Sequence, residues 1–136
     1  MTPKEKMKAN KTITILEDQK INVRIILSGL WVSHFLLWTF GDMASLLQEI
    51  SKPVANELLL FVAVPLAVIQ VLMVFFSLTG KPKIMRWINI GLALVFIVFN
   101  IIFLIDAHAG WEYLLGAAYL LLNVLIIWYA VKWPKK

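Results

Sequence analysis

A run of apolar residues occupies positions 58–78 and reads LLLFVAVPLAVIQVLMVFFSL. It contains no Asp, Glu, Lys or Arg, and a helix of this length crosses the roughly 30 Å hydrocarbon core of a bilayer. Because a charge at mid-membrane costs ~2.5–3.5 kcal/mol, so long an uncharged run indicates a transmembrane helix. Three similar stretches lie at 25–40, 87–105 and 113–131.

The composition of the whole chain agrees with this interpretation. Its 136 residues are 61% hydrophobic and 15% charged, with a mean hydropathy of +0.83, whereas soluble domains are about half apolar and a quarter charged. Since lipid offers the backbone no hydrogen bonds, the spans must be helices. We expect an all-α membrane protein with a four-transmembrane-helix bundle at 21–134, after a basic tail at 1–20. The predicted spans are approximately 23–43, 56–78, 86–106 and 111–132.

The basic residues fall almost entirely on one side of these spans. Apart from Lys52, every Lys and Arg belongs to the N-terminal tail, the loop between the second and third spans, or the C-terminus. The positive-inside rule predicts that both termini are cytoplasmic, in a multi-pass protein of the cell membrane. Anionic lipid headgroups at the cytoplasmic face, worth about 1 kcal/mol per basic residue, account for the net charge of +5. No nucleic-acid partner is needed.

Local signals mark the helix boundaries and exclude some chemistry. Gly80 and Pro82 predict the end of the second span, and Pro65 predicts a kink within it. The chain has no Cys, which excludes disulfides, thiolate catalysis and Cys-ligated metals. His108 and Glu112 have the spacing of two helical metal ligands, but an apparent loop separates them. We therefore predict no metal site and no cofactor.

Acidic residues cluster on the side opposite the basic ones. Asp42, Asp106 and Glu112 each end or begin a span there. A rim of carboxylates around the mouth of a bundle would attract cations. The alternative, that these side chains are solvated residues at helix ends, stays open.

Polar side chains recur at helical spacing within the spans. His34, Trp38 and Asp42 share one face of the first helix, and a rise of 1.5 Å per residue places His34 roughly 12 Å below Asp42. By the same arithmetic Asn100 lies roughly 9 Å below Asp106, so His34 and Asn100 are expected near one depth. We predict a polar pocket that descends from the acidic rim. Its candidate ligand-binding residues are His34, Trp38, Asp42, Asn100, Glu112, Tyr119 and Asn123.

A structural role for the same side chains is also open. Amides such as Gln70, Asn100 and Asn123 form hydrogen bonds between membrane helices, worth about 0.6 kcal/mol on average. His34 is the titratable side chain placed deepest in a span, which makes it a candidate functional residue by default. A neutral, hydrogen-bonded histidine in the core is the alternative.

Several phrases resemble the DUF6326 family of small four-span bacterial membrane proteins of unknown function. They are Leu30-Trp31-Val32-Ser33 with Gly41-Asp42, the stretch from Leu72 to Leu78, Lys81-Pro82-Lys83 with Arg86-Trp87-Ile88-Asn89, Leu115-Gly116, and the stretch from Ile127 to Pro134. The resemblance covers nearly the whole chain from Ile21 onward and implies four membrane helices without an established activity. It marks Asp42, Arg86, Asn89 and Trp133 as motif positions. The family's expected acid in the fourth helix is replaced here by Tyr119.

The sequence favours a binding or transport protein over an enzyme. The expected ligand is a small lipophilic or cationic molecule, or a lipid, in a pocket open to the extracytoplasmic side. Small multidrug exporters resemble this chain only in size and span count, because they rely on a mid-membrane Glu where this chain has His34. One alternative is a membrane-embedded isomerase or hydrolase using His34 or an outer carboxylate, although no nucleophile–base pair can be placed. Another is a structural subunit of a membrane complex. A homodimer is left open.

Overall fold

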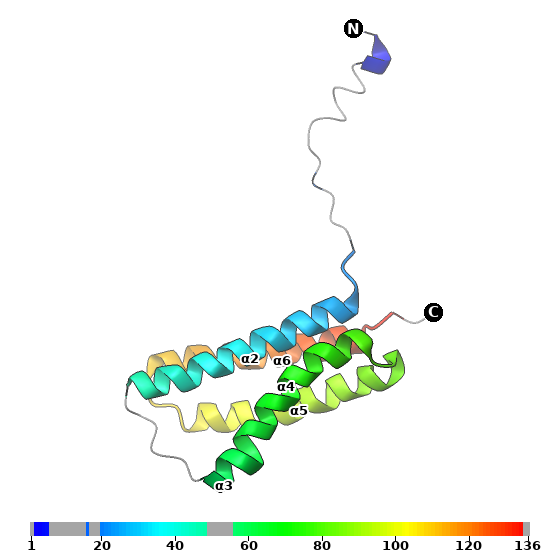
Figure 1. Cartoon of the computed structure of the whole chain (residues 1–136). Coiled ribbons are helices and arrows are strands. Elements are labelled where there is room, and N and C mark those ends of the chain that lie inside the picture. The colour runs from blue at the N-terminus through cyan, green and yellow to red at the C-terminus, as the bar shows by residue number, and fades with distance from the viewer. Residues whose placement is uncertain (1, 6–15, 17–19, 49–55, 135–136) are drawn as a thin grey trace.

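The computed structural model describes residues 2–5, 16, 20–48 and 56–134. Its main elements are α2 (Val23–Leu47), α3 (Asn56–Leu58), the π-helical turn η1 (Leu59–Ala63), α4 (Val64–Thr79), α5 (Pro82–Ile105) and α6 (Gly110–Val131) (Figure 1). Because α3, η1 and α4 form one continuous helix, the described chain has four helices long and apolar enough to cross a membrane. The predicted all-α, four-helix architecture is confirmed.

The helix boundaries follow their capping residues. The Asn22 side chain accepts a hydrogen bond from the backbone N–H of Arg24 at 2.9 Å and starts α2. This helix continues to Leu47, beyond the expected end at 43. Pro82 opens α5 directly after Gly80 ends α4, since a missing N–H costs nothing in the first turn.

The second span is irregular just before its proline. Pro65 has no N–H to donate to the carbonyl of Phe61, which lies four residues earlier. The preceding turn, η1, is widened to π-helical geometry and returns to α-helix at Val64. The disturbance predicted at Pro65 therefore takes the form of a π-helical turn on its N-terminal side.

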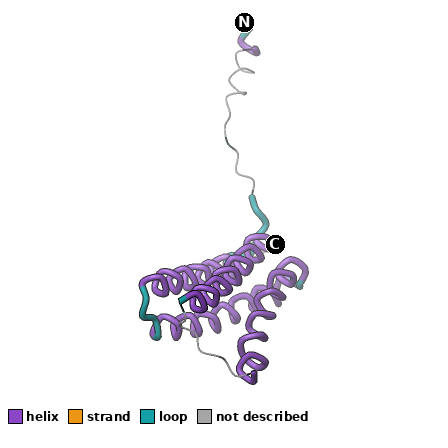
Figure 2. Tube along the Cα trace, turned by 60° about the vertical axis from the view of Figure 1, so that its left-hand side comes forward, coloured by secondary structure: helices purple, strands orange, loops and turns teal. Residues whose placement is uncertain are grey.

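The four helices do not pack equally. The central helix α2 contacts both α4 and α6, and α5 contacts mainly α6. α4 has few contacts with α5 and diverges from it toward α3 (Figures 1 and 2). The start of α2, the turn between α4 and α5 and the end of α6 lie at one end of the bundle (Figure 1). We call this the basic end, defined by Arg24, Lys81, Lys83, Arg86 and Lys132, and the opposite one the acidic end, defined by Asp42, Glu57, Asp106 and Glu112.

The bundle is apolar outside and polar inside. Large aliphatic and aromatic side chains are exposed along every span, which suits contact with lipid. The buried polar side chains, in contrast, belong to all four helices. Trp31, Phe96 and Ile126 pack around them as the apolar part of the interior. Polar groups inside a membrane bundle must pair with one another or face a wet cavity.

Candidate functional site

A hydrogen-bonded cluster at the centre of the bundle takes one side chain from each long helix. His34 of α2 lies with Nδ1 2.6 Å from Gln70 Oε1 of α4. Its Nε2 lies 3.2 Å from Asn100 Nδ2 of α5 and 3.3 Å from Asn123 Nδ2 of α6. All four side chains are fully buried. We call them the polar hub; the expectation that His34 and Asn100 share one depth is confirmed.

The partners of the hub determine the proton position on His34. The indole N–H of Trp38 can only donate, and it donates to Asn100 Oδ1 at 3.0 Å. The other atom of that amide, Nδ2, therefore faces His34 Nε2, which must accept. The ring proton is then on Nδ1, where Gln70 Oε1 accepts it. The orientation of the Asn100 amide thus determines which ring nitrogen of His34 carries the proton. The hub holds a neutral histidine, and both of its ring nitrogens are hydrogen-bonded.

A second buried cluster lies between the hub and the basic end. Trp31 donates its indole N–H to Asn89 Oδ1 at 2.8 Å, and the Asn89 amide also contacts Ser77 and the backbone of Met85. Close by, Arg24 donates to the Ser77 carbonyl at 3.2 Å. The cluster joins α2, α4 and α5, so most buried polar groups in this half of the bundle are paired. Asn123 Oδ1 in the hub and Arg86 Nε at the basic end are buried without a described hydrogen-bond partner.

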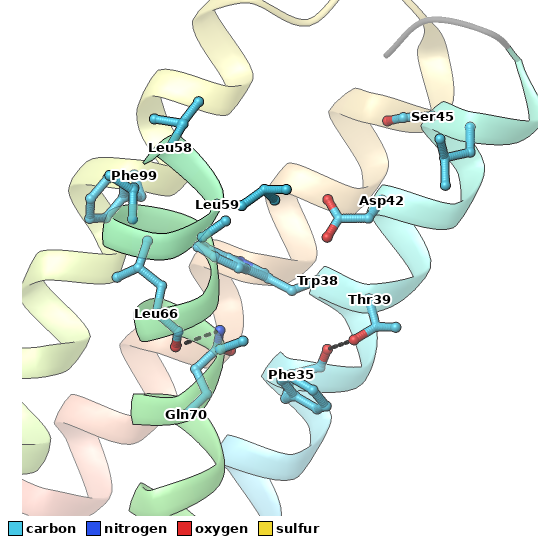
Figure 3. Close-up of a pocket in the computed structure, with 14 residues that line it drawn as sticks. Phe35, Trp38, Thr39, Asp42, Ser45, Leu58, Leu59, Leu66, Gln70 and Phe99 are labelled. Atoms are coloured by element: carbon cyan, nitrogen blue, oxygen red, sulfur yellow. Dashed lines mark hydrogen bonds between the residues drawn. The ribbon is translucent and has the colours of Figure 1, made fainter. Parts of the chain in front are cut away.

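The acidic half of the bundle contains two adjacent cavities instead. The larger, of ≈ 940 Å³, is a groove between α2 and the η1–α4 stretch, with Phe99 of α5 at one side. In Figure 3, leucine side chains of the second span face the Trp38 ring across this groove, and the Asp42 carboxylate points into it. The side chains that line the groove are those of Phe35, Trp38, Thr39, Asp42, Ser45, Leu46, Leu58, Leu59, Val62, Ala63, Leu66, Ala67, Gln70 and Phe99.

The smaller cavity, of ≈ 190 Å³, lies between α2, α5 and α6. It is bordered by Trp38, Gly41, Asp42, Ser45, Phe99, Asn100, Phe103 and Tyr119. We call it the inner cavity. Trp38, Asp42, Ser45 and Phe99 border both spaces, so the groove and the inner cavity share a wall.

Close packing of α2 against α6 shapes the inner cavity. Tyr119 donates its hydroxyl to the Leu37 carbonyl at 2.9 Å. A Cβ atom on Gly41 would lie 2.5 Å from the Tyr119 hydroxyl oxygen and 2.9 Å from Leu115 Cδ2. A side chain larger than that of glycine at position 41 would therefore require Tyr119 and Leu115 to shift.

Asp42 is the charged side chain of both cavities. No described residue forms a hydrogen bond or an ion pair with its carboxylate, although it lies within a helix long enough to span the membrane. The hydroxyl of Ser45, one turn away, donates to the Gly41 carbonyl at 3.0 Å. The carboxylate therefore faces a space lined mostly by apolar side chains.

Glu112, predicted as a ligand-binding residue, lies apart from the two cavities. Its carboxylate accepts the backbone N–H groups of Ala109 at 3.0 Å and His108 at 3.3 Å, which caps the start of α6. It borders neither cavity. Across the described residues, no group of three or more metal-binding side chains comes together.

The predicted site residues thus separate into three groups. Trp38, Asp42, Asn100 and Tyr119 border a cavity; His34 and Asn123 belong to the hub without bordering either cavity; and Glu112 caps a helix. Sequence reasoning missed Ser45, Phe99 and Phe103 as lining residues. Their spacing carries a signal, because Ser45 lies three residues after Asp42 and Phe103 lies three residues after Asn100.

Comparison of the chain with protein-family models, curated proteins and solved structures finds no match.

Proposed function

We propose that this multi-pass membrane protein binds a small lipophilic cation in the groove between α2 and the second span. The observation that carries the proposal is the Asp42 carboxylate, which has no described partner and faces a groove of ≈ 940 Å³. An acidic side chain at the end of a span that faces an apolar groove supplies a counter-charge for a cationic ligand.

The chemistry of the lining favours a lipophilic cation over a metal ion. Apart from Asp42, the groove offers the hydroxyls of Thr39 and Ser45 and the amide of Gln70 among mainly apolar side chains. Hard cations such as Ca²⁺ need six to eight oxygen ligands, which this lining does not provide. An organic cation needs one counter-charge and an apolar wall, and Asp42 and the apolar side chains of the groove offer both.

The charge distribution supports an orientation for the protein. The described basic residues of the bundle gather at one end, which the positive-inside rule assigns to the cytoplasm. The groove would then open on the extracytoplasmic side of the cell membrane, and the basic end would contact anionic lipid headgroups. Membership of the DUF6326 family, a bacterial origin and a homodimer are compatible with this arrangement.

The polar hub supports a structural rather than a catalytic role for His34. An enzyme would need His34 to exchange protons with a substrate, yet the side chain is fully buried and both ring nitrogens are hydrogen-bonded. We therefore place ligand binding at Asp42 and assign the hub to holding the four helices together.

Binding of tetraphenylphosphonium to the purified protein tests the proposal. The protein is reconstituted in nanodiscs, and empty nanodiscs give the background. The wild type should bind the cation, and Asp42→Asn should weaken binding about three-fold or more, since the exposed Asp42 side chain supplies the counter-charge of the groove.

Asp106→Asn is the matched control, because Asp106 is an acid at the same end that borders neither cavity. It should bind as the wild type does. Wild-type binding no better than that of empty nanodiscs, or equal loss in both variants, would refute the proposal. Accumulation of the same cation in cells that express the wild type but not Asp42→Asn would separate transport from binding.

A further inference from the structure

We infer that the ligand is a single-chain amphiphile whose methylated ammonium headgroup occupies the inner cavity while its alkyl chain lies in the groove. The inference rests on the proposed function and names the class of ligand for the same site. It follows from three features of the inner cavity: its aromatic wall, its occupied hydrogen-bonding groups and the wall that it shares with the groove.

Four aromatic side chains border the inner cavity together with one carboxylate. Phe103 and Tyr119 pack edge to face with ring centroids 5.6 Å apart, as do Trp38 and Tyr119 at 6.3 Å, so the three rings form one continuous aromatic wall. Phe99 and the Asp42 carboxylate complete this part of the lining. Aromatic rings within about 6 Å of a cation attract it, and aromatic cages are the usual site for quaternary ammonium groups.

The donor groups around the inner cavity are already engaged. Asn100 Nδ2 faces His34, the Tyr119 hydroxyl donates to the Leu37 carbonyl, and the Ser45 hydroxyl donates to the Gly41 carbonyl. A primary ammonium needs acceptors for three N–H groups, which Asp42 and the remaining lone pairs of these hydroxyls would have to supply together. A trimethylammonium group needs no acceptor and instead contacts the aromatic side chains, so the aromatic lining favours the methylated cation.

Because the two cavities share a wall, the alkyl chain of the ligand is placed in the groove. Trp38 and Asp42 border both spaces, so a headgroup in the inner cavity lies beside the groove. The inner cavity, at ≈ 190 Å³, takes only a compact group, whereas the groove of ≈ 940 Å³ is lined by Leu59, Leu66 and other apolar side chains. An alkyl chain in the groove would remove apolar surface from water.

The charges of the lining favour a cationic amphiphile over a zwitterionic lipid. No described Lys or Arg borders either cavity, and the described basic residues of the bundle lie at the other end. The phosphate of a phosphatidylcholine would lie close to Asp42 without a counter-charge. The expected ligand therefore carries a net positive charge.

Competition between octyltrimethylammonium and octylammonium tests the headgroup. Nanodiscs of phosphatidylethanolamine and phosphatidylglycerol hold the wild-type protein, and radiolabelled octyltrimethylammonium is displaced by each unlabelled cation. We expect the methylated cation to bind about five-fold or more tightly than the primary one. Equal affinities, or a preference for the primary amine, would overturn the inference.

The Phe103→Leu variant tests the inner cavity separately from the groove. Phe103 borders only the inner cavity, so this variant should lose about five-fold in octyltrimethylammonium affinity while tetraphenylphosphonium binding is unchanged. Phe61→Leu is the matched control, because Phe61 is exposed on η1 and borders neither cavity. An undiminished affinity in Phe103→Leu, with thermal unfolding like that of the wild type, would contradict the headgroup assignment.

Two further outcomes distinguish the inference from the proposed function. If the wild type binds tetraphenylphosphonium through Asp42 but not octyltrimethylammonium, the proposed function stands and this inference fails. If neither cation binds, both fail. Adding phosphatidylcholine to the nanodiscs should leave octyltrimethylammonium binding unchanged, and its suppression would mean that a lipid headgroup, rather than a soluble amphiphile, occupies the cavity.

Discussion

The two halves of the bundle differ in how their polar side chains are paired. From the basic end to the polar hub, buried amides, indoles and His34 pair across the helices. Toward the acidic end, α4 diverges from α5, two cavities open, and Asp42 has no described partner. We infer that polar groups in these spans stabilise the bundle where neighbouring helices satisfy most of them, and are available to a ligand where they do not.

Replacing the histidine of the hub should have the largest effect on stability. His34→Ala leaves Gln70, Asn100 and Asn123 without their common partner and opens a cavity among packed rings. We expect a loss of about 2–4 kcal/mol in the free energy of unfolding. Denaturation followed by circular dichroism in mixed micelles measures it.

His108→Ala is the control for this variant, because His108 is exposed at the acidic end. It should change the free energy of unfolding by less than about 0.5 kcal/mol. A fully stable His34→Ala protein that no longer binds cations would reverse the comparison, since His34 would then serve the ligand.

Gly41→Ala should have an intermediate effect, because Gly41 lies where the halves meet. The new methyl group would contact the Tyr119 hydroxyl and Leu115 and push α2 away from α6. The expected loss is about 1–2 kcal/mol in the free energy of unfolding, with weaker cation binding. Gly29→Ala on the same helix meets nothing within 4 Å and should slightly stabilise the protein. Similar effects of the two variants would contradict the close approach.

Glu112→Gln should have a smaller effect. The amide oxygen can still accept from Ala109 and His108, but its charge no longer interacts with the N-terminus of α6. We expect a loss of about 0.5 kcal/mol in stability and unchanged binding of tetraphenylphosphonium. Loss of binding would restore Glu112 as a ligand-binding residue.

Asp42→Asn should change stability least of all. Since no described residue pairs with Asp42, its neutralisation should leave the free energy of unfolding within about 0.5 kcal/mol of the wild type, or raise it slightly. Side chains that serve function rather than folding commonly show this pattern. A loss comparable to that of His34→Ala would indicate that Asp42 is part of the fold.

The architecture and the polar stripes could be predicted from the sequence. Lipid excludes charge and requires satisfied backbone, so apolar length defines each span. Asn89, Phe96 and Asn100 likewise stand at helical spacing in the sequence, and all three lie on the buried face of α5. These predictions succeed because each depends on one helix at a time.

The cavities depend on how the helices lie relative to one another. The spacing of residues along a single helix does not predict this arrangement. Ala63 shares the helical face of Gln70 in the second span, yet Gln70 is buried and Ala63 is exposed, because that helix diverges toward its start. Phe99 and Phe103 look like ordinary lipid-facing residues in sequence, although they line the cavities. Glu112 and Asp42 are equivalent acids in sequence, and only the backbone N–H groups at Ala109 and His108 distinguish the two.

The attraction of cations by Asp42 is the central claim, and thiol labelling tests it most directly. The chain has no Cys, and Ser45 borders both cavities, so Ser45→Cys places a single thiol beside the carboxylate. Its rates with trimethylammonium and sulfonate methanethiosulfonates, each normalised to a free thiol in solution, give a charge-selectivity ratio. We predict a ratio of about ten or more in favour of the cation, which falls toward one when Asp42→Asn is added. A ratio near one in the presence of Asp42 would contradict the account.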